Sequence, residues 1–151
     1  MADPKLMRIM KTLAGRVENI RVSNAFNTDI GRTVKRYPRV FNQEECPASS
    51  IFLGGGSNGG SQGTGVKTDP ELIIRASIAF GDDEPEDVAI SMMADIHKAI
   101  ELPSSTIPQQ PDLIRNINET SWQIVYPDNV GDVVSVELTY SFSYSRKYGE
   151  D

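Results

Sequence analysis

Residues 133–145 alternate strictly between apolar and polar side chains. The apolar positions are Val134, Val136, Leu138, Tyr140, Phe142 and Tyr144. The positions between them hold serine, threonine or glutamate, apart from the leading valine. A period of two residues is typical of a β-strand that buries one face. At about 3.3 Å per residue this strand spans roughly 40 Å, well beyond the usual strand of about 5 to 6 residues. We therefore expect the end of this strand to extend beyond a single small domain, where another subunit could bind.

Shorter segments with the same period predict the other strands. Residues 71–80 alternate, and so do residues 120–126. A turn-forming segment, PDNVGD at 127–132, leads from the latter into the long strand, so the two should form a C-terminal hairpin. Residues 48–53 predict a short buried strand, and residues 32–40, which contain a proline, suit an edge strand.

Two segments have the helical period instead. Asp3 and Pro4 resemble a helix start, with Asp as N-cap and Pro in the first turn, and apolar residues then recur at helical spacing up to Ile20. The second helix is predicted over residues 85–101, after an acidic run at 82–87 that complements the helix dipole. His97 is expected on its polar, exposed side.

Seven glycines fall within the twelve residues 54–65. Such a tract predicts a loop that is mobile in the free protein and orders on docking. Its glycines formally match a dinucleotide-binding fingerprint, but that fingerprint needs a helix to follow, and Asp69 and Pro70 follow here instead. The candidates for a flexible docking loop are Gly54, Gly56, Asn58, Gly60, Gln62 and Gly65.

This order of elements predicts one α+β domain over residues 1–151. We expect a mixed, mainly antiparallel sheet, two main helices on one of its faces and a long C-terminal hairpin. The polar face of the long strand would then remain open to water or to another subunit. Residues 146–151 are expected to fray.

The charge is distributed unevenly. The net charge is −6, which argues against a general nucleic-acid binder. Residues 1–39 hold nine basic and three acidic residues, whereas residues 40–151 hold six basic and eighteen acidic ones. Two solvated faces that happen to differ would explain this split. A polarised subunit, whose basic part meets the acidic part of a neighbour, would explain it too.

The sequence offers little for catalysis or metal binding. Its one cysteine, Cys46, follows Glu44 and Glu45, which should raise the pKa of the thiol, and its one histidine lacks a second histidine for a metal site. We predict no enzyme, no cofactor and no metal. No apolar run reaches membrane-spanning length and the N-terminus does not read as a secretory signal, so we expect assembly in the cytoplasm.

Five segments together resemble the tail terminator (tail completion) proteins of long-tailed bacteriophages. They are LMRIMKTLAGRVENI, FNTDIGRTVKR, ASSIFLG, ELIIRASIAFGDDEPEDVAISMMADIHKAIE and WQIVYPDNVGDVVSVELTYSFSY. The most specific parts are residues 27–36 and 71–101, and the likeness covers nearly the whole chain. The glycine tract departs from the pattern, because it is longer and richer in glycine.

The resemblance implies a structural virion protein rather than an enzyme. It implies a ring, usually a hexamer, that caps the growing tail tube, ends its polymerisation and offers a surface for joining the head. The implied partners are further copies of the chain, the tail tube protein and a neck or head-completion protein, with DNA only passing through the lumen. The implied location is the tail or neck of a virion that is assembled in the host bacterial cytoplasm.

The charge split and the overlong strand supply candidates for the contacts of such a ring. The candidate interface residues are Arg32, Lys35, Arg36, Arg39, Glu44, Glu45, Ser141, Ser143, Ser145 and Arg146. We expect Arg32, Lys35, Arg36 and Arg39 to face acidic residues of a neighbouring subunit or ring. Two alternatives stay open at this point, namely another neck or head-completion connector and an oligomeric domain that binds a small ligand.

Overall fold

The computed structural model describes residues 3–63, 65–101, 115–127 and 133–149. Its elements, in chain order, are helix α1 (Lys5–Glu18), strand β1 (Val34–Lys35), strand β2 (Ala48–Gln62), strand β3 (Gly65–Ala79), helix α2 (Pro85–Ile100), strand β4 (Arg115–Val125) and strand β5 (Val133–Lys147). Short 3-10 turns at Val22–Asn24 and Gln43–Glu45 flank β1.

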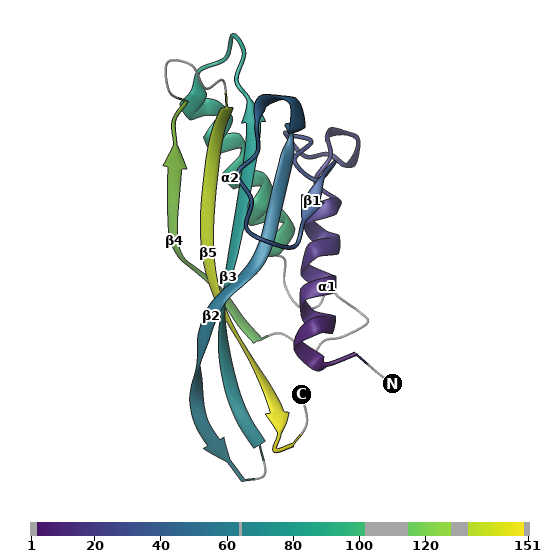
Figure 1. The fold of residues 1–151 in the computed structure, drawn as a ribbon, viewed down its shortest axis with the longest axis vertical. Coiled ribbons are helices and arrows are strands. Elements are labelled where there is room, and N and C mark those ends of the chain that lie inside the picture. Colours follow the sequence, from purple (N-terminus) through teal and green to yellow (C-terminus); the bar gives the residue numbers. More distant parts are fainter. Residues whose placement is uncertain (1–2, 64, 102–114, 128–132, 150–151) are drawn as a thin grey trace.

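The strands of the described residues form one mixed sheet in the order β1-β2-β3-β5-β4 (Figure 1). β1 runs parallel to β2, and all other neighbours are antiparallel. β4 and β5 pair from Arg115 opposite Ser143 to Val125 opposite Ser135. The predicted α+β domain with a C-terminal hairpin is therefore confirmed.

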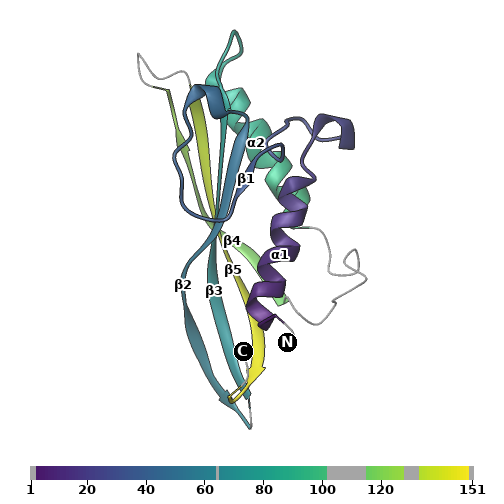
Figure 2. The same cartoon turned by 45° about the vertical axis from the view of Figure 1, so that its right-hand side comes forward.

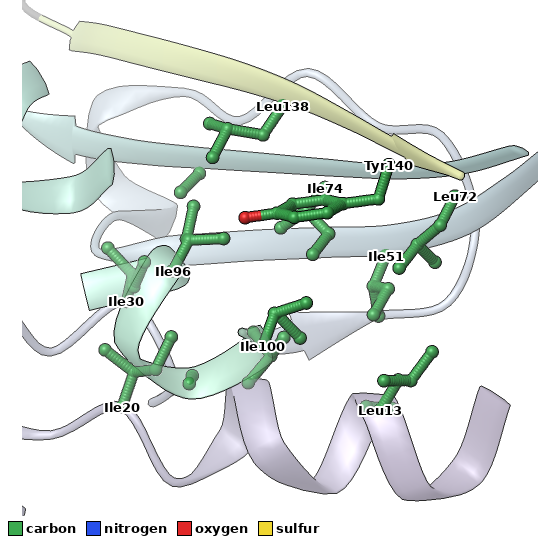
Figure 3. Packing of buried hydrophobic residues seen from close by; sticks show 14 of the residues in the cluster. Leu13, Ile20, Ile30, Ile51, Leu72, Ile74, Ile96, Ile100, Leu138 and Tyr140 are labelled. Atoms are coloured by element: carbon green, nitrogen blue, oxygen red, sulfur yellow. The ribbon is translucent and has the colours of Figure 1, made fainter. Parts of the chain in front are cut away.

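Both helices lie on the same face of the sheet, as Figures 1 and 2 show. The apolar side of β5 points toward them, and all six of its predicted apolar positions are buried. In the core, side chains of the sheet such as Ile74 and Leu138 meet Leu13 of α1 and Ile96 of α2 (Figure 3). Burying one such side chain contributes about 1.5–3 kcal/mol, so this layer carries much of the stability.

Part of the sheet extends beyond the helices. β2, β3 and β5 continue past the end of α1 in both views (Figures 1 and 2). We call the distal part of these three strands, residues 54–62, 65–71 and 141–147, the arm. Phe142 and Tyr144 at its base are still buried in the core, and its tip extends beyond the helices. Lys67 lies opposite Ser145, and Gly65 lies opposite Lys147 at its tip. The overhang expected for β5 is thus shared by three paired strands.

The glycine tract is not the loop that we expected. Residues 54–62 belong to β2 and pair with β3, with irregularities in register at Leu53/Gly55 and Asn58/Ser61. Strand pairing uses backbone groups, so a segment without side chains can still pair when a neighbouring strand is in place. At Gly56 an added Cβ would come within 2.9 Å of the Asp69 carbonyl oxygen, so glycine permits the close approach there.

Several predicted boundaries also shift. The N-cap of α1 is Pro4 rather than Asp3, and the Asp3 carboxylate pairs with Lys11 at 2.5 Å. β3 begins at Gly65 instead of residue 71, because it pairs with both β2 and β5 along the arm. For the same reason Arg146 and Lys147, which we expected to fray, belong to β5.

Candidate assembly surfaces

Cys46 lies beside a pocket of about 440 Å³ that is also lined by acidic residues, among them Asp29, Asp83 and Asp87. The Cys46 thiol donates to the Asn42 carbonyl oxygen at 3.3 Å. Burial raises the pKa of this thiol, and the neighbouring Glu45 raises it further. A raised pKa disfavours the nucleophilic thiolate, so this pocket lacks an activated nucleophile at Cys46.

Within the described ranges, no group of three or more histidine, cysteine, aspartate or glutamate side chains is placed to hold a metal ion. His97, half-buried on α2, instead lies 2.6 Å from Glu119 of β4, measured from Nε2 to Oε2. This contact ties the helix to the edge strand of the sheet. We predicted His97 on the exposed side of α2, but it is half-buried, and nothing in the sequence indicated its contact with Glu119.

The basic candidates before and after β1 divide into two groups. Arg32 and Arg36 are exposed and Lys35 is half-buried, and no hydrogen bond or ion pair of these three side chains is formed with the described part of the chain. Arg39 differs, because its guanidinium bonds the Glu45 carboxylate and the Tyr37 hydroxyl. These partners raise the pKa of Arg39, with the Tyr37 hydrogen bond as the larger cause.

Arg39 and Glu45 therefore satisfy each other within one subunit. Glu45 also accepts the Asn42 backbone N–H, which closes a capping box at the turn that holds both acidic candidates. Glu44 of the same turn is exposed. Of the four basic candidates, Arg32, Lys35 and Arg36 remain as charges that a neighbour could meet.

The candidates on β5 lie on the arm and on its border with the main sheet. Ser143 donates to Asp69 Oδ1 of β3 at 2.6 Å, and the Ser145 carbonyl accepts from Lys5 Nζ of α1 at 2.6 Å. Ser141 lies opposite Glu71 and is half-buried, as is Arg146 nearer the tip. These contacts fix β5 to the rest of its own subunit.

The glycine-tract candidates lie on the same arm, one strand away. Asn58 Oδ1 accepts from Thr68 Oγ1 at 3.3 Å, and Gln62 lies opposite Gly65 at the tip. Gly54, Gly56 and Gly60 are exposed. Two groups of candidates that the sequence suggested separately are therefore joined through β3.

One edge of the arm has no partner strand among the described residues. β1 pairs with β2 only at Ser49 and Ser50, and from Ile51 to Gln62 no described strand lies on that side of β2. Unpaired N–H and C=O groups along a strand can pair with a strand of another molecule. The glycine tract thus provides a backbone edge with small side chains.

The face of the sheet opposite the helices carries polar side chains beside apolar ones such as Phe52 and Val125. The hydroxyls of Ser77 and Ser135 are 2.8 Å apart, and Arg75 Nε donates to Glu137 Oε2 at 2.5 Å. Arg75 also lies over the Phe52 ring, 5.1 Å from its centroid. The polar face that we predicted for β5 is thus partly accessible, and its arginine is neutralised within the subunit.

Sequence reasoning missed one surface, where α2 runs beside β4. Ile90, Trp122 and Tyr126 are each about half exposed there, although all three are large and apolar. Alternation did place Trp122 and Tyr126 on one face of β4 but gave no sign that the helix leaves this face partly uncovered. The exposed fraction depends on where α2 crosses the sheet, which no local pattern encodes.

Compared with known proteins, the chain matches no family model and no curated protein. No helix in the described part of the chain is long and apolar enough to cross a membrane. The likeness to tail terminators stays a prediction, and a function has to be argued from the surfaces above.

Proposed function

We propose that this chain is a structural virion protein that forms a ring on the tail tube, ends tail polymerisation and provides the surface for head joining. In this proposal it is assembled in the bacterial cytoplasm and resides in the tail or neck. Its partners are its own copies, in a ring that the resemblance suggests is hexameric, together with the tail tube protein and a neck protein.

The arm is the observation that carries this proposal. It extends past the helix layer and ends in a glycine-rich β2 whose outer edge has no partner strand among the described residues. A ring needs two different complementary surfaces on each subunit. A protruding strand edge is suited to one of them, because strand addition joins two chains through backbone hydrogen bonds without demanding particular side chains.

The polar face of the sheet supports a role beside passing DNA. The hydroxyls of Ser77 and Ser135 bond to each other there, and Arg75 is neutralised by Glu137. Affinity for DNA comes largely from lysine and arginine that neutralise phosphates. A face on which the arginine is already paired would let DNA pass without gripping it, so we propose that this face lines the lumen.

Polymerisation of the tail tube protein tests the function. Tube protein is polymerised with increasing, substoichiometric amounts of the chain, and tube lengths are measured by negative-stain imaging. A terminator should shorten the tubes and sit at one end only, because each ring blocks one growing end. Unchanged lengths with no density at tube ends would reject the proposal, and binding only to tubes that have already stopped growing would favour a neck or head-completion protein.

A further inference from the structure

The two lateral edges of the molecule carry opposite charge. β1 and β4 stand at opposite ends of the strand order, and in Figure 1 they lie on opposite sides of the molecule. The segment through β1, residues 32–36, reads RTVKR and contains no acidic residue. Residues 85–97 of α2 and residues 116–127 around β4 contain no lysine or arginine. The uneven charge along the sequence thus becomes an uneven charge across the fold.

The acidic edge is built by one stripe of α2 and the adjacent side of β4. Glu86, Ile90, Met93, His97 and Glu101 recur every three or four residues and therefore lie along one flank of the helix. Contacts at both ends show that this flank faces β4. They are the Tyr126 hydroxyl donating to Glu86 Oε2 at 3.2 Å and the His97–Glu119 contact at 2.6 Å.

Between these two contacts lie apolar side chains that the fold leaves uncovered. Trp122 lies opposite Leu138 on the helix side of the sheet, yet it is 56% exposed. Ile90 of α2 is 52% exposed and Tyr126 is 51% exposed. We call Glu86, Ile90, Glu101, Trp122 and Tyr126 the acidic aromatic edge. A tryptophan and a tyrosine rimmed by charge have the composition of a protein interface.

The opposite edge has the complementary composition. Arg32 and Arg36 are exposed, Lys35 is half-buried, and Tyr37 beside them is 49% exposed. We call these four residues the basic edge. Arg39 does not belong to it, because it is bonded to Glu45 of its own chain. Lys98 is also excluded from the acidic side, since it faces the other flank of α2, where it donates to Ala25 O and lies over the Phe26 ring.

We propose that the occupant of the acidic aromatic edge is the basic edge of a second copy of this chain. Because the two edges differ and lie on opposite sides of one subunit, the contact is heterologous and repeats from copy to copy. Trp122 and Ile90 provide the apolar centre, and Glu86 and Glu101 face Lys35 and Arg36 of the next subunit. This contact adds detail to the proposed function. It rests on that function only for the claim that the row of subunits closes into a ring.

Charge reversal on one edge at a time tests the contact. The first variant is Lys35→Glu with Arg36→Glu, and the second is Glu86→Lys with Glu101→Lys. Each alone should be monomeric in sedimentation experiments at low salt, where the wild type associates. Mixed in equal amounts they should associate again, because each retains the native edge that the other needs. Asp82→Lys with Asp83→Lys changes the charge as much as the second variant, at exposed residues that belong to neither edge, and should associate as the wild type does.

The apolar centre has its own test. Trp122→Ser should weaken association about tenfold or more, since a central tryptophan often dominates an interface. Val22→Ser is the matched control, because Val22 is 55% exposed but lies on neither edge. Thermal unfolding of each variant shows whether it is folded. If Lys35→Glu with Arg36→Glu is unfolded, Lys35→Gln with Arg36→Gln takes its place.

A wild type that stays monomeric at every concentration, or reversed variants that associate as the wild type does, would overturn the contact. Failure of the proposed function gives a different result. If copies associate through these edges but do not stop tube growth, the contact stands and the terminator function falls. If the reversed variants still cap tubes, the function stands and the contact falls.

Discussion

Asp95 is a buried carboxylate on α2 that holds the segment between α1 and β1 in place. It accepts the Asn27 N–H at 2.9 Å, the Thr28 N–H at 2.7 Å and the Thr28 hydroxyl at 2.6 Å. Asp95 is 1% exposed and Thr28 is 8% exposed, so the carboxylate and the two Thr28 donors have little access to water. Residues 27–36, one of the two segments on which the predicted likeness to tail terminators mainly rests, thus begin at a fixed point of the core.

Replacing Asp95 should cost much of the stability of the domain. Asp95→Ala leaves the three donors without their acceptor, and we expect the free energy of unfolding to fall by about 2–4 kcal/mol. Urea denaturation measures the change. Asp82→Ala, at an exposed carboxylate, should change it by less than about 0.5 kcal/mol. Equal effects of the two substitutions would contradict the anchoring role.

Tyr140 has a hydroxyl without a hydrogen-bond partner among the described residues. The side chain is fully buried, and in Figure 3 its oxygen points toward Ile96 of α2. Burial strongly raises the pKa of this phenol, and the nearby Glu101 and Glu119 add to the effect. The hydroxyl therefore contributes desolvation cost without a compensating hydrogen bond.

Removing the Tyr140 hydroxyl should not destabilise the folded protein. We expect Tyr140→Phe to leave the free energy of unfolding unchanged or to raise it by up to about 1 kcal/mol, because an unpaired buried polar group is lost while the ring remains. Thermal and urea unfolding would measure it. A loss of more than about 1 kcal/mol would mean that the hydroxyl has a partner in the folded protein. Tyr140→Leu provides the comparison in which the packing of the ring is lost as well.

The helices and strands that could be predicted are those with a periodic pattern of apolar residues in their own sequence. The alternation along β5 and the helical spacing along α1 and α2 are properties of the segments themselves, so their types and the C-terminal hairpin could be predicted. The first part of β2, residues 48–53, could be predicted too. Its extension through residues 54–62 could not, because this glycine-rich stretch carries no pattern and its strand formation depends on β3 lying opposite. The His97–Glu119 and Arg39–Glu45 contacts depend likewise on tertiary structure.

The strand nature of the glycine tract can be tested by hydrogen exchange. Amides of residues 54–62 that pair with β3 should exchange more slowly than amides of exposed turns such as residues 81–83, because backbone pairing protects them. Nuclear magnetic resonance or mass spectrometry of the isolated protein gives the rates. If all amides of residues 54–62 exchange as fast as those turns, the tract is the mobile loop that we predicted from the sequence and not a paired strand.

For the whole molecule, the fold converts the uneven charge along the sequence into two opposed lateral edges. Some of the basic residues are used within the subunit, as Arg39 with Glu45 and Arg16 with the Ile100 carbonyl show. Those through β1 remain available and stand opposite the acidic flank of α2 and β4. The arm adds an edge of β2 with which no strand of the described residues pairs. A subunit of this shape is suited to a ring that also contacts a tube.

The most direct test of the ring is the mass of the particle in solution combined with negative-stain imaging, on the purified chain with and without tail tube protein. We predict closed rings of uniform size that appear on mixing with tubes, if not before, and that sit at one end of each tube. Because the ring can need the tube as a template to close, the mixture of the chain with tubes is the deciding measurement. A chain that remains monomeric in the presence of tubes and leaves both tube ends bare would contradict the account.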